Sequence, residues 1–145
     1  MITRKSDTVE GYTLSVETQN DTYRIGDKIS VRVRLKNVSE DTVRIRQATP
    51  FRTFDIELKL PDGKKAPLTL FGQRVLFSGA LGSKSARELK PSEEYESSFN
   101  LSRIFDMTLA GKYDLTVSKK VWIRDGGTKT KTVSSPSLTI SVTEE

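Results

Sequence analysis

The stretch that decides the fold is Ile29-Ser30-Val31-Arg32-Val33-Arg34-Leu35, which alternates strictly between apolar and polar residues just after Gly26-Asp27. Successive side chains of a β-strand point to opposite faces, so this alternation predicts a strand with one buried and one solvated face. The same pattern recurs in segments along the rest of the chain, and no helix pattern interrupts them. The sequence therefore predicts an all-β protein, an immunoglobulin-like sandwich of two antiparallel sheets with about eight or nine strands.

The chain of 145 residues has the length of one domain. Residues 1–9 read as a flexible, polar lead-in, and residues 10–145 as a single sandwich domain. Between the strands, residues 67–77 hold two short apolar pieces around Gly72. Residues 78–85 form a loop rich in Gly and Ser, and one short helical turn fits within residues 102–109.

Two residue types are missing from the whole chain, since the counts of cysteine and histidine are both 0. Their absence excludes disulfides, thiolate and imidazole metal sites, and catalytic triads that use histidine as the base. The acidic residues follow no calcium-loop pattern, and neighbours such as Glu93 and Glu94 alternate faces on a strand. We therefore expect a protein that is not an enzyme and takes no metal or other cofactor.

The N-terminus, Met1 to Asp7, lacks the apolar run of a signal peptide, and no stretch has the roughly 20 apolar residues needed to cross a bilayer. As written, the sequence indicates a cytoplasmic protein, or a secreted or periplasmic one if a leader preceded it. Three short N-x-[ST] sequons, at Asn20, Asn37 and Asn100, matter only in a source that glycosylates.

Four short motifs follow one another between Ile29 and Val117. They are Leu35-Lys36-Asn37-Val38-Ser39, Phe54-Asp55-Ile56 before Asp62-Gly63-Lys64, Leu89-Lys90-Pro91-Ser92-Glu93, and Ala110-Gly111-Lys112-Tyr113. This order resembles that of bacterial immunoglobulin-like domains, in particular the intracellular proteinase inhibitor family. The resemblance implies a sandwich that inhibits a protease through an exposed loop. Ser92 departs from the glycine usual in that family, and the tryptophan expected after the Asp62-Gly63-Lys64 turn is missing.

Tyr113 follows a turn at Gly111, in the position of a tyrosine corner. In such a corner the ring packs inward and the hydroxyl bonds to the backbone a few residues upstream. We expect Tyr113 to have this structural role.

A first candidate binding site is basic. The cations Arg32, Arg34 and Lys36 share the polar side of one predicted strand, and Arg44 and Arg46 share that of the next. If these strands pair directly, five cations converge and could bind a polyanion. If the chain crosses between sheets instead, the cations lie on opposite faces. The formal net charge of +5 is modest and no aromatic residues interleave, which argues against nucleic acid and favours a solvated face.

A second candidate lies in the loops, because loops on a rigid sandwich carry recognition. The stretch Ser78 to Ser85 is not a phosphate-binding loop, since Ser83 precedes Lys84 and the required glycine is missing there. We expect it to contact a partner together with the residues before it and the turn at Asp125-Gly126-Gly127. The predicted contact residues are Phe71, Arg74, Phe77, Leu81, Lys84, Trp122 and Asp125.

Trp122 points away from the side of Val121 and Ile123. It either packs beneath the Asp125-Gly126-Gly127 turn, the interpretation we favour, or forms an exposed platform for a sugar or a protein. Taken together, the sequence predicts a non-catalytic module that binds another protein, possible partners including a protease. The alternatives are a proteinase inhibitor and a binder of carbohydrate or polyanion.

Overall fold

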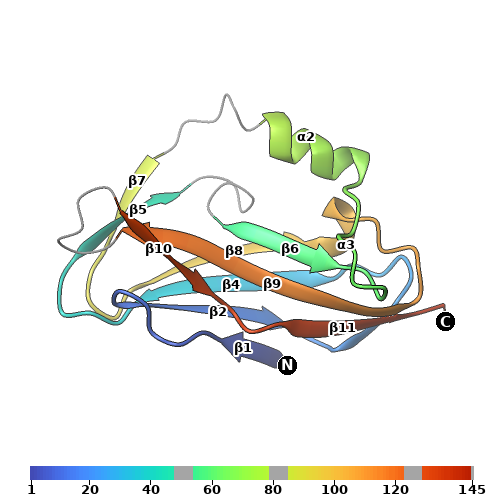
Figure 1. The fold of residues 1–145 in the computed structure, drawn as a ribbon, viewed down its shortest axis with the longest axis horizontal. Helices are drawn as coiled ribbons and strands as arrows, with labels where there is room; N and C mark the ends of the chain where they lie inside the picture. The colour runs from blue at the N-terminus through green and yellow to red at the C-terminus, as the bar shows by residue number, and fades with distance from the viewer. Residues whose placement is uncertain (48–53, 79–84, 123–128, 145) are drawn as a thin grey trace.

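The computed structural model describes residues 1–47, 54–78, 85–122 and 129–144 and shows an all-β sandwich, as predicted (Figure 1). One sheet has the strand order β1-β2-β4-β8, and the other has the order β10-β9-β11-β3 with β6 also paired to β9. A separate pair joins β5 to β7. The strands of the first sheet are β1 (Ile2–Lys5), β2 (Tyr12–Thr18), β4 (Ser30–Asn37) and β8 (Glu94–Asn100).

The second sheet contains β3 (Thr22–Arg24), β6 (Asp55–Lys59), β9 (Gly111–Trp122), β10 (Thr130–Ser134) and β11 (Leu138–Thr143). The small pair consists of β5 (Val43–Gln47) and β7 (Ser85–Leu89). All these pairings are antiparallel except that of β3 with β11, which is parallel.

The core lies between the two sheets, where the inward-facing residues of each strand meet. In β4 the buried residues are Val31, Val33 and Leu35, so the alternation in the sequence marks the inner face correctly. Leu14 and Val16 of the neighbouring β2 extend this inner face, and the opposite sheet contributes Leu115 and Val117 of β9 and Leu138 and Ile140 of β11. All six are at 0% exposure. Burial of these side chains is the main favourable term in folding.

The N-terminal residues differ from the expected flexible lead-in. Ile2–Lys5 form β1, which pairs with β2 from Ile2 opposite Thr18 to Lys5 opposite Ser15. Strand pairing needs only backbone groups. β1 supplies hydrogen-bond partners for the backbone N–H and C=O groups on the edge of β2 that faces away from β4. A strand with the polar sequence Thr3-Arg4-Lys5 suits an outer edge, because charged residues discourage further pairing.

A helix also replaces the two apolar pieces expected before residue 78. The segment α2 (Leu70–Ser78) begins after Thr69, whose hydroxyl oxygen accepts a hydrogen bond from the backbone N–H of Gly72 at 3.0 Å. Such a side-chain acceptor satisfies one of the N–H groups that a helix start leaves unpaired. The short helical turn expected later in the chain is confirmed as α3 (Leu101–Ile104).

Asn37 links two of the segments that the sequence motifs had marked, residues 35–39 and residues 89–93. Its side-chain amide donates to the carbonyl oxygens of Asp41 at 2.7 Å and Leu89 at 2.9 Å. Its side-chain oxygen accepts from the backbone N–H and the hydroxyl of Ser39. The backbone of Asn37 also bonds to Ser92 and Glu93, in the turn between β7 and β8. Since Asn37 is fully buried, it acts as the structural link between these turns.

The tyrosine corner is confirmed. Tyr113 is fully buried, and its hydroxyl donates to the carbonyl oxygen of Leu109 at 2.6 Å. At Gly111, φ is +140° and an added Cβ would lie 2.5 Å from Cγ of Pro61, so a side chain there would clash. Gly111, at the start of β9, thus lies directly against Pro61.

Replacing Tyr113 with phenylalanine should lower the free energy of unfolding by about 1 kcal/mol, because a buried hydrogen bond is lost. Burial raises the pKa of Tyr113 above its ordinary value of 10.0. Above that pH the unfolded chain binds fewer protons than the folded one, so stability falls as pH rises. Urea unfolding of both proteins at about pH 8 and about pH 11 tests this, and the variant should lose part of the alkaline decline. Equal stability at the lower pH would contradict the structural role.

Candidate functional site

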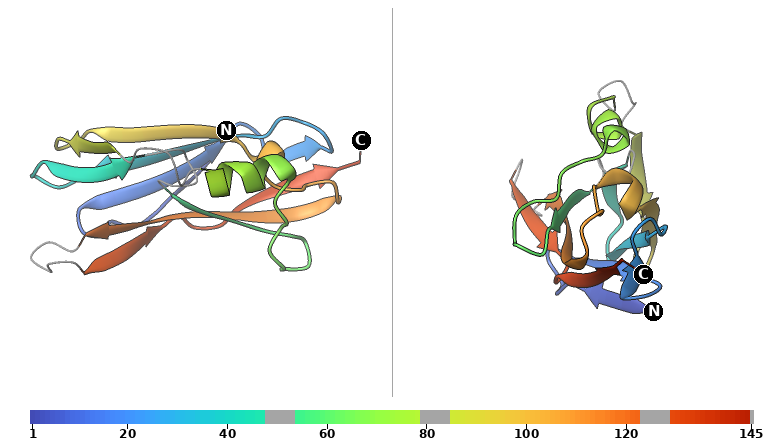
Figure 2. Two further views of the ribbon diagram at one scale, coloured as in Figure 1. Left: turned by 90° about the horizontal axis from the view of Figure 1, so that it is seen from above. Right: turned by 90° about the vertical axis from the view of Figure 1, so that its right-hand side faces the viewer.

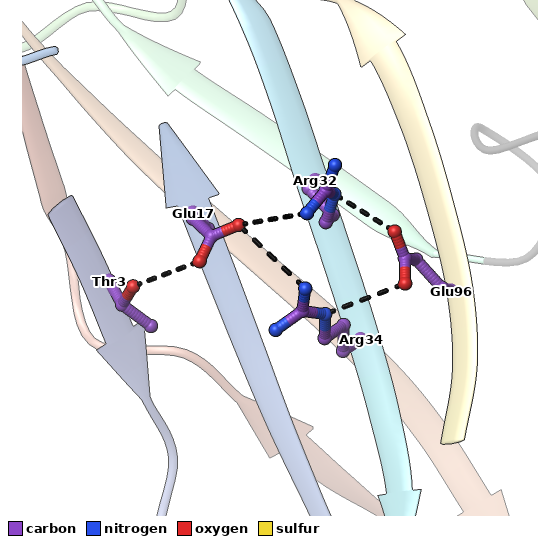
Figure 3. Close-up of polar contacts among 5 residues, drawn as sticks. All are labelled: Thr3, Glu17, Arg32, Arg34 and Glu96. Atoms are coloured by element: carbon purple, nitrogen blue, oxygen red, sulfur yellow. Dashed lines mark hydrogen bonds and ion pairs between the residues drawn. The ribbon is translucent and has the colours of Figure 1, made fainter. Parts of the chain in front are cut away.

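Arg32 and Arg34 of β4 lie on the outer face of the first sheet, between two glutamates (Figure 3). Glu17 of β2 is opposite Arg32, and Glu96 of β8 is opposite Arg34. The Arg32 guanidinium lies 2.8 Å from Glu96 and 3.5 Å from Glu17, and that of Arg34 lies 3.6 Å from Glu96 and 4.0 Å from Glu17. Each arginine therefore has two carboxylate neighbours.

Direct pairing of the two basic strands, the condition for five converging cations, is not what the structure shows. β4 pairs with β2 and β8, and β5 pairs with β7. The turn held by Asn37 and Ser39 directs β5 away from β4, which is why Arg44 and Arg46 leave the sheet of Arg32, Arg34 and Lys36. Arg44 lies 3.9 Å from Glu88, and only the backbone of Arg46 is described.

The charges of Arg32 and Arg34 are already balanced by carboxylate neighbours. We therefore expect the double variant Arg32→Gln/Arg34→Gln to lose no more heparin affinity than any variant that removes two positive charges. The matched control is Lys112→Gln/Lys120→Gln, which removes the same charge from exposed positions of β9. Elution from heparin resin should occur at the same salt concentration for the two double variants. A clearly earlier elution of the arginine variant would show that β4 binds the polyanion.

Glu93 and Glu96, near the start of β8, each have a structural partner. Glu93 accepts a hydrogen bond from the backbone N–H of Lys90 at 2.6 Å, and Glu96 pairs with the two arginines. Asp106 accepts from the hydroxyl and backbone of Thr108, which lowers the pKa of its carboxyl group. Among the described residues, no group of three or more acidic side chains has the geometry to hold a metal ion.

Neither of the helices in the described part of the chain has the length and the apolar character of a membrane-spanning segment.

One lysine faces inward in the row of core residues along β9. Lys119 follows Tyr113, Leu115 and Val117 at the spacing of one strand face, and its ammonium lies 5.8 Å from the centre of the Phe54 ring. Partial burial lowers the pKa of Lys119, and the nearby Asp55 opposes that shift. Lys119 therefore packs beside Phe54 at the end of this row of core residues.

The helix α2 lies at the periphery of the sandwich beside α3, as Figure 1 and the right-hand view of Figure 2 show. Its position depends on the first turn. Thr69 donates from its backbone N–H to the carbonyl oxygen of Ile104 at 2.9 Å and from its hydroxyl to that of Arg103 at 2.5 Å. Gly72 lies against Ile104, where a Cβ atom would approach the carbonyl carbon to 3.0 Å. The start of α2 is therefore fixed on α3.

Two large apolar side chains are exposed at this fixed start. Leu70 is 75% exposed and Phe71 is 36% exposed. The guanidinium carbon of Arg103, from α3, lies 3.8 Å from the centre of the Phe71 ring, and Arg74 is exposed on the next turn of α2. We call these four residues the α2 surface: Leu70, Phe71, Arg74 and Arg103.

The sequence had marked Phe71 and Arg74 as contact residues but not Leu70 or Arg103. A signal for Leu70 was present, since Thr69 before two apolar residues is a possible helix start. Arg103 lies 32 positions after Phe71 (103 − 71), and only the folded chain brings the two together. Of Phe77 and Trp122 the structure describes only the backbone, in α2 and at the end of β9. Leu81, Lys84 and Asp125 lie outside the described residues.

Comparison with known proteins places the chain in no family. No family model matches it, and no curated protein matches it. Among solved structures, a beta-glucosidase from Listeria innocua in complex with glucose is similar over 89% of this chain, with 13% sequence identity and a TM-score of 0.42. The chain spans 16% of the length of that enzyme. We draw neither fold nor activity from a likeness of this size.

Proposed function

We propose that this protein is a non-catalytic binding module that docks another protein through the α2 surface. The observation that carries the proposal is the exposure of Leu70 and Phe71, 75% and 36%, on a helix start that is hydrogen-bonded to α3. Large apolar side chains held in place at a surface are typical of interfaces, where burial against a partner provides the affinity. The lack of histidine and cysteine in the whole chain supports a role without catalysis.

The ordered position of the surface supports docking as well. Thr69 and Gly72 fix the backbone that carries Leu70 and Phe71, so little conformational entropy is lost when a partner binds. The polar outer face of the first sheet is a weaker candidate for docking, since Arg32 and Arg34 already have two glutamate neighbours each.

The test is photo-crosslinking in extracts of the source cells, with p-benzoylphenylalanine in place of Leu70. A matched control carries the same group in place of Lys112, an exposed residue of β9. We expect a crosslinked protein from position 70 and none from position 112. Excess unlabelled wild-type protein should compete, and the variant Leu70→Ser/Phe71→Ser should not. Equal crosslinking at both positions, or competition by the double variant, would overturn the proposal.

A further inference from the structure

The guanidinium of Arg103 lies over the ring of Phe71. Its guanidinium carbon lies 3.8 Å from the centre of the Phe71 ring, a distance at which the planar cation stacks on the aromatic face. In this arrangement the ring covers one face of the guanidinium, and the N–H donors point outward from its edge. A stacked arginine is preorganised, so less rotamer entropy is lost when those donors bind an acceptor.

The charge of Arg103 is not balanced within the described part of the chain. Arg32, Arg34 and Arg44 each lie within 4.0 Å of a glutamate oxygen. Five other arginines, Arg4, Arg24, Arg74, Arg87 and Arg103, form no such ion pair with any described residue, and of these Arg74 and Arg103 belong to the α2 surface. The first turn of α2 contains no acidic side chain, and the nearest acid along the chain, Asp106, already accepts two hydrogen bonds from Thr108.

We infer that the α2 surface recognises a protein segment in which a carboxylate stands next to an apolar side chain. The inference rests on the proposed function and names the chemistry of the partner. The Arg103 guanidinium binds the carboxylate through two N–H donors, with Arg74 adding positive charge, and the apolar side chain packs against Leu70 and Phe71. Two arginines beside two large apolar residues suit a protein segment better than a nucleic acid, whose binding depends on many phosphate contacts.

The experiment uses the full chain on an array of nonapeptides in which two adjacent central positions carry every pair of residue types within a Gly/Ser/Ala background. The strongest signals should come from pairs that combine Asp or Glu with Leu, Ile, Met or Phe. Arg103→Gln should reduce the preference for Asp and Glu about tenfold and leave the preference for apolar residues. Leu70→Ser should reduce the preference for apolar residues and leave the preference for Asp and Glu. The matched control Arg44→Gln, at an exposed arginine of β5, should change neither preference.

Several outcomes would overturn the inference. One is a wild-type array without a preference for Asp or Glu, and another is a preference that Arg103→Gln leaves intact. Phosphoserine peptides are added to the array as a further comparison, and a stronger signal from them than from Asp and Glu peptides would assign the site to phosphate instead. Circular dichroism spectra and melting curves that match wild type confirm that each variant is folded. Crosslinking from position 70 is independent of this chemistry: a crosslinked partner without an acidic preference would contradict this inference and leave the proposed function standing.

Discussion

Replacing Asn37 with alanine should lower the free energy of unfolding by about 3 kcal/mol, since a buried polar group that loses its partner costs about 1–3 kcal/mol. The substitution leaves the carbonyl oxygens of Asp41 and Leu89 without the amide donor that now reaches them at 2.7 and 2.9 Å. It also removes the acceptor for the backbone N–H of Ser39, at 3.0 Å. The turn after β4 and the end of β7 therefore lose their common link.

Urea unfolding followed by circular dichroism measures this loss. The matched control is Asn20→Ala, at an exposed asparagine, which should change stability by less than about 0.5 kcal/mol. Asn37→Asp is a second probe, because it keeps the acceptor for Ser39 and replaces the donor by a group that cannot bond to a carbonyl while it is ionised. It should also destabilise the fold. A loss of less than about 1 kcal/mol in Asn37→Ala would contradict the linking role.

The parts of this fold that could be predicted from the sequence are those set by local patterns. Alternation identified Val31, Val33 and Leu35 as the inner face of β4, because the side-chain period of a strand is a property of the strand alone. The tyrosine corner was predictable for the same reason, since Tyr113 and Leu109 are only four residues apart. The resemblance to the inhibitor family and the immunoglobulin-like label remain predictions.

Long-range pairing was not predictable. Arg32 and Arg34 formed a cationic pattern in the sequence, yet their charges are balanced by Glu17 and Glu96, which reach them from two other strands. The motif around Asn37 was visible, but its role depends on Leu89, 52 residues away. The position of a partner strand depends on the register of the whole sheet, which alternation within one strand does not specify.

The helix α2 was missed because its stability depends on what it packs against. A segment of nine residues with a glycine near its start is too short to form a stable helix alone. Its position comes from Thr69 and Gly72, which contact α3 about 30 residues further along the chain. The exposed pair of Leu70 and Phe71 became a candidate site only once that packing was known.

Gly72→Ala is the sharpest test of this packing, because local and tertiary effects predict opposite signs. In an isolated helix, alanine is more favourable than glycine by about 1 kcal/mol. In this structure the new Cβ would overlap the carbonyl oxygen of Ile104 and lie 3.0 Å from its carbonyl carbon. Those atoms belong to the backbone of α3, so they cannot rotate away as a side chain would. Overpacking of this kind costs about 1–3 kcal/mol, and we expect a net loss of about 1–2 kcal/mol.

The matched control is Gln73→Ala, at the next position of α2, where the side chain is exposed. That variant should be neutral or slightly more stable than wild type, by a few tenths of a kcal/mol. The alanine methyl group faces α3 at position 72 and solvent at position 73, so urea unfolding of the two variants separates packing against α3 from helix propensity. Displacement of α2 by Gly72→Ala should also weaken partner crosslinking from position 70, since the start of α2 would no longer be fixed on α3. A stabilised Gly72→Ala protein would show that α2 does not rest on Ile104, and the α2 surface would then lose the fixed backbone on which docking depends.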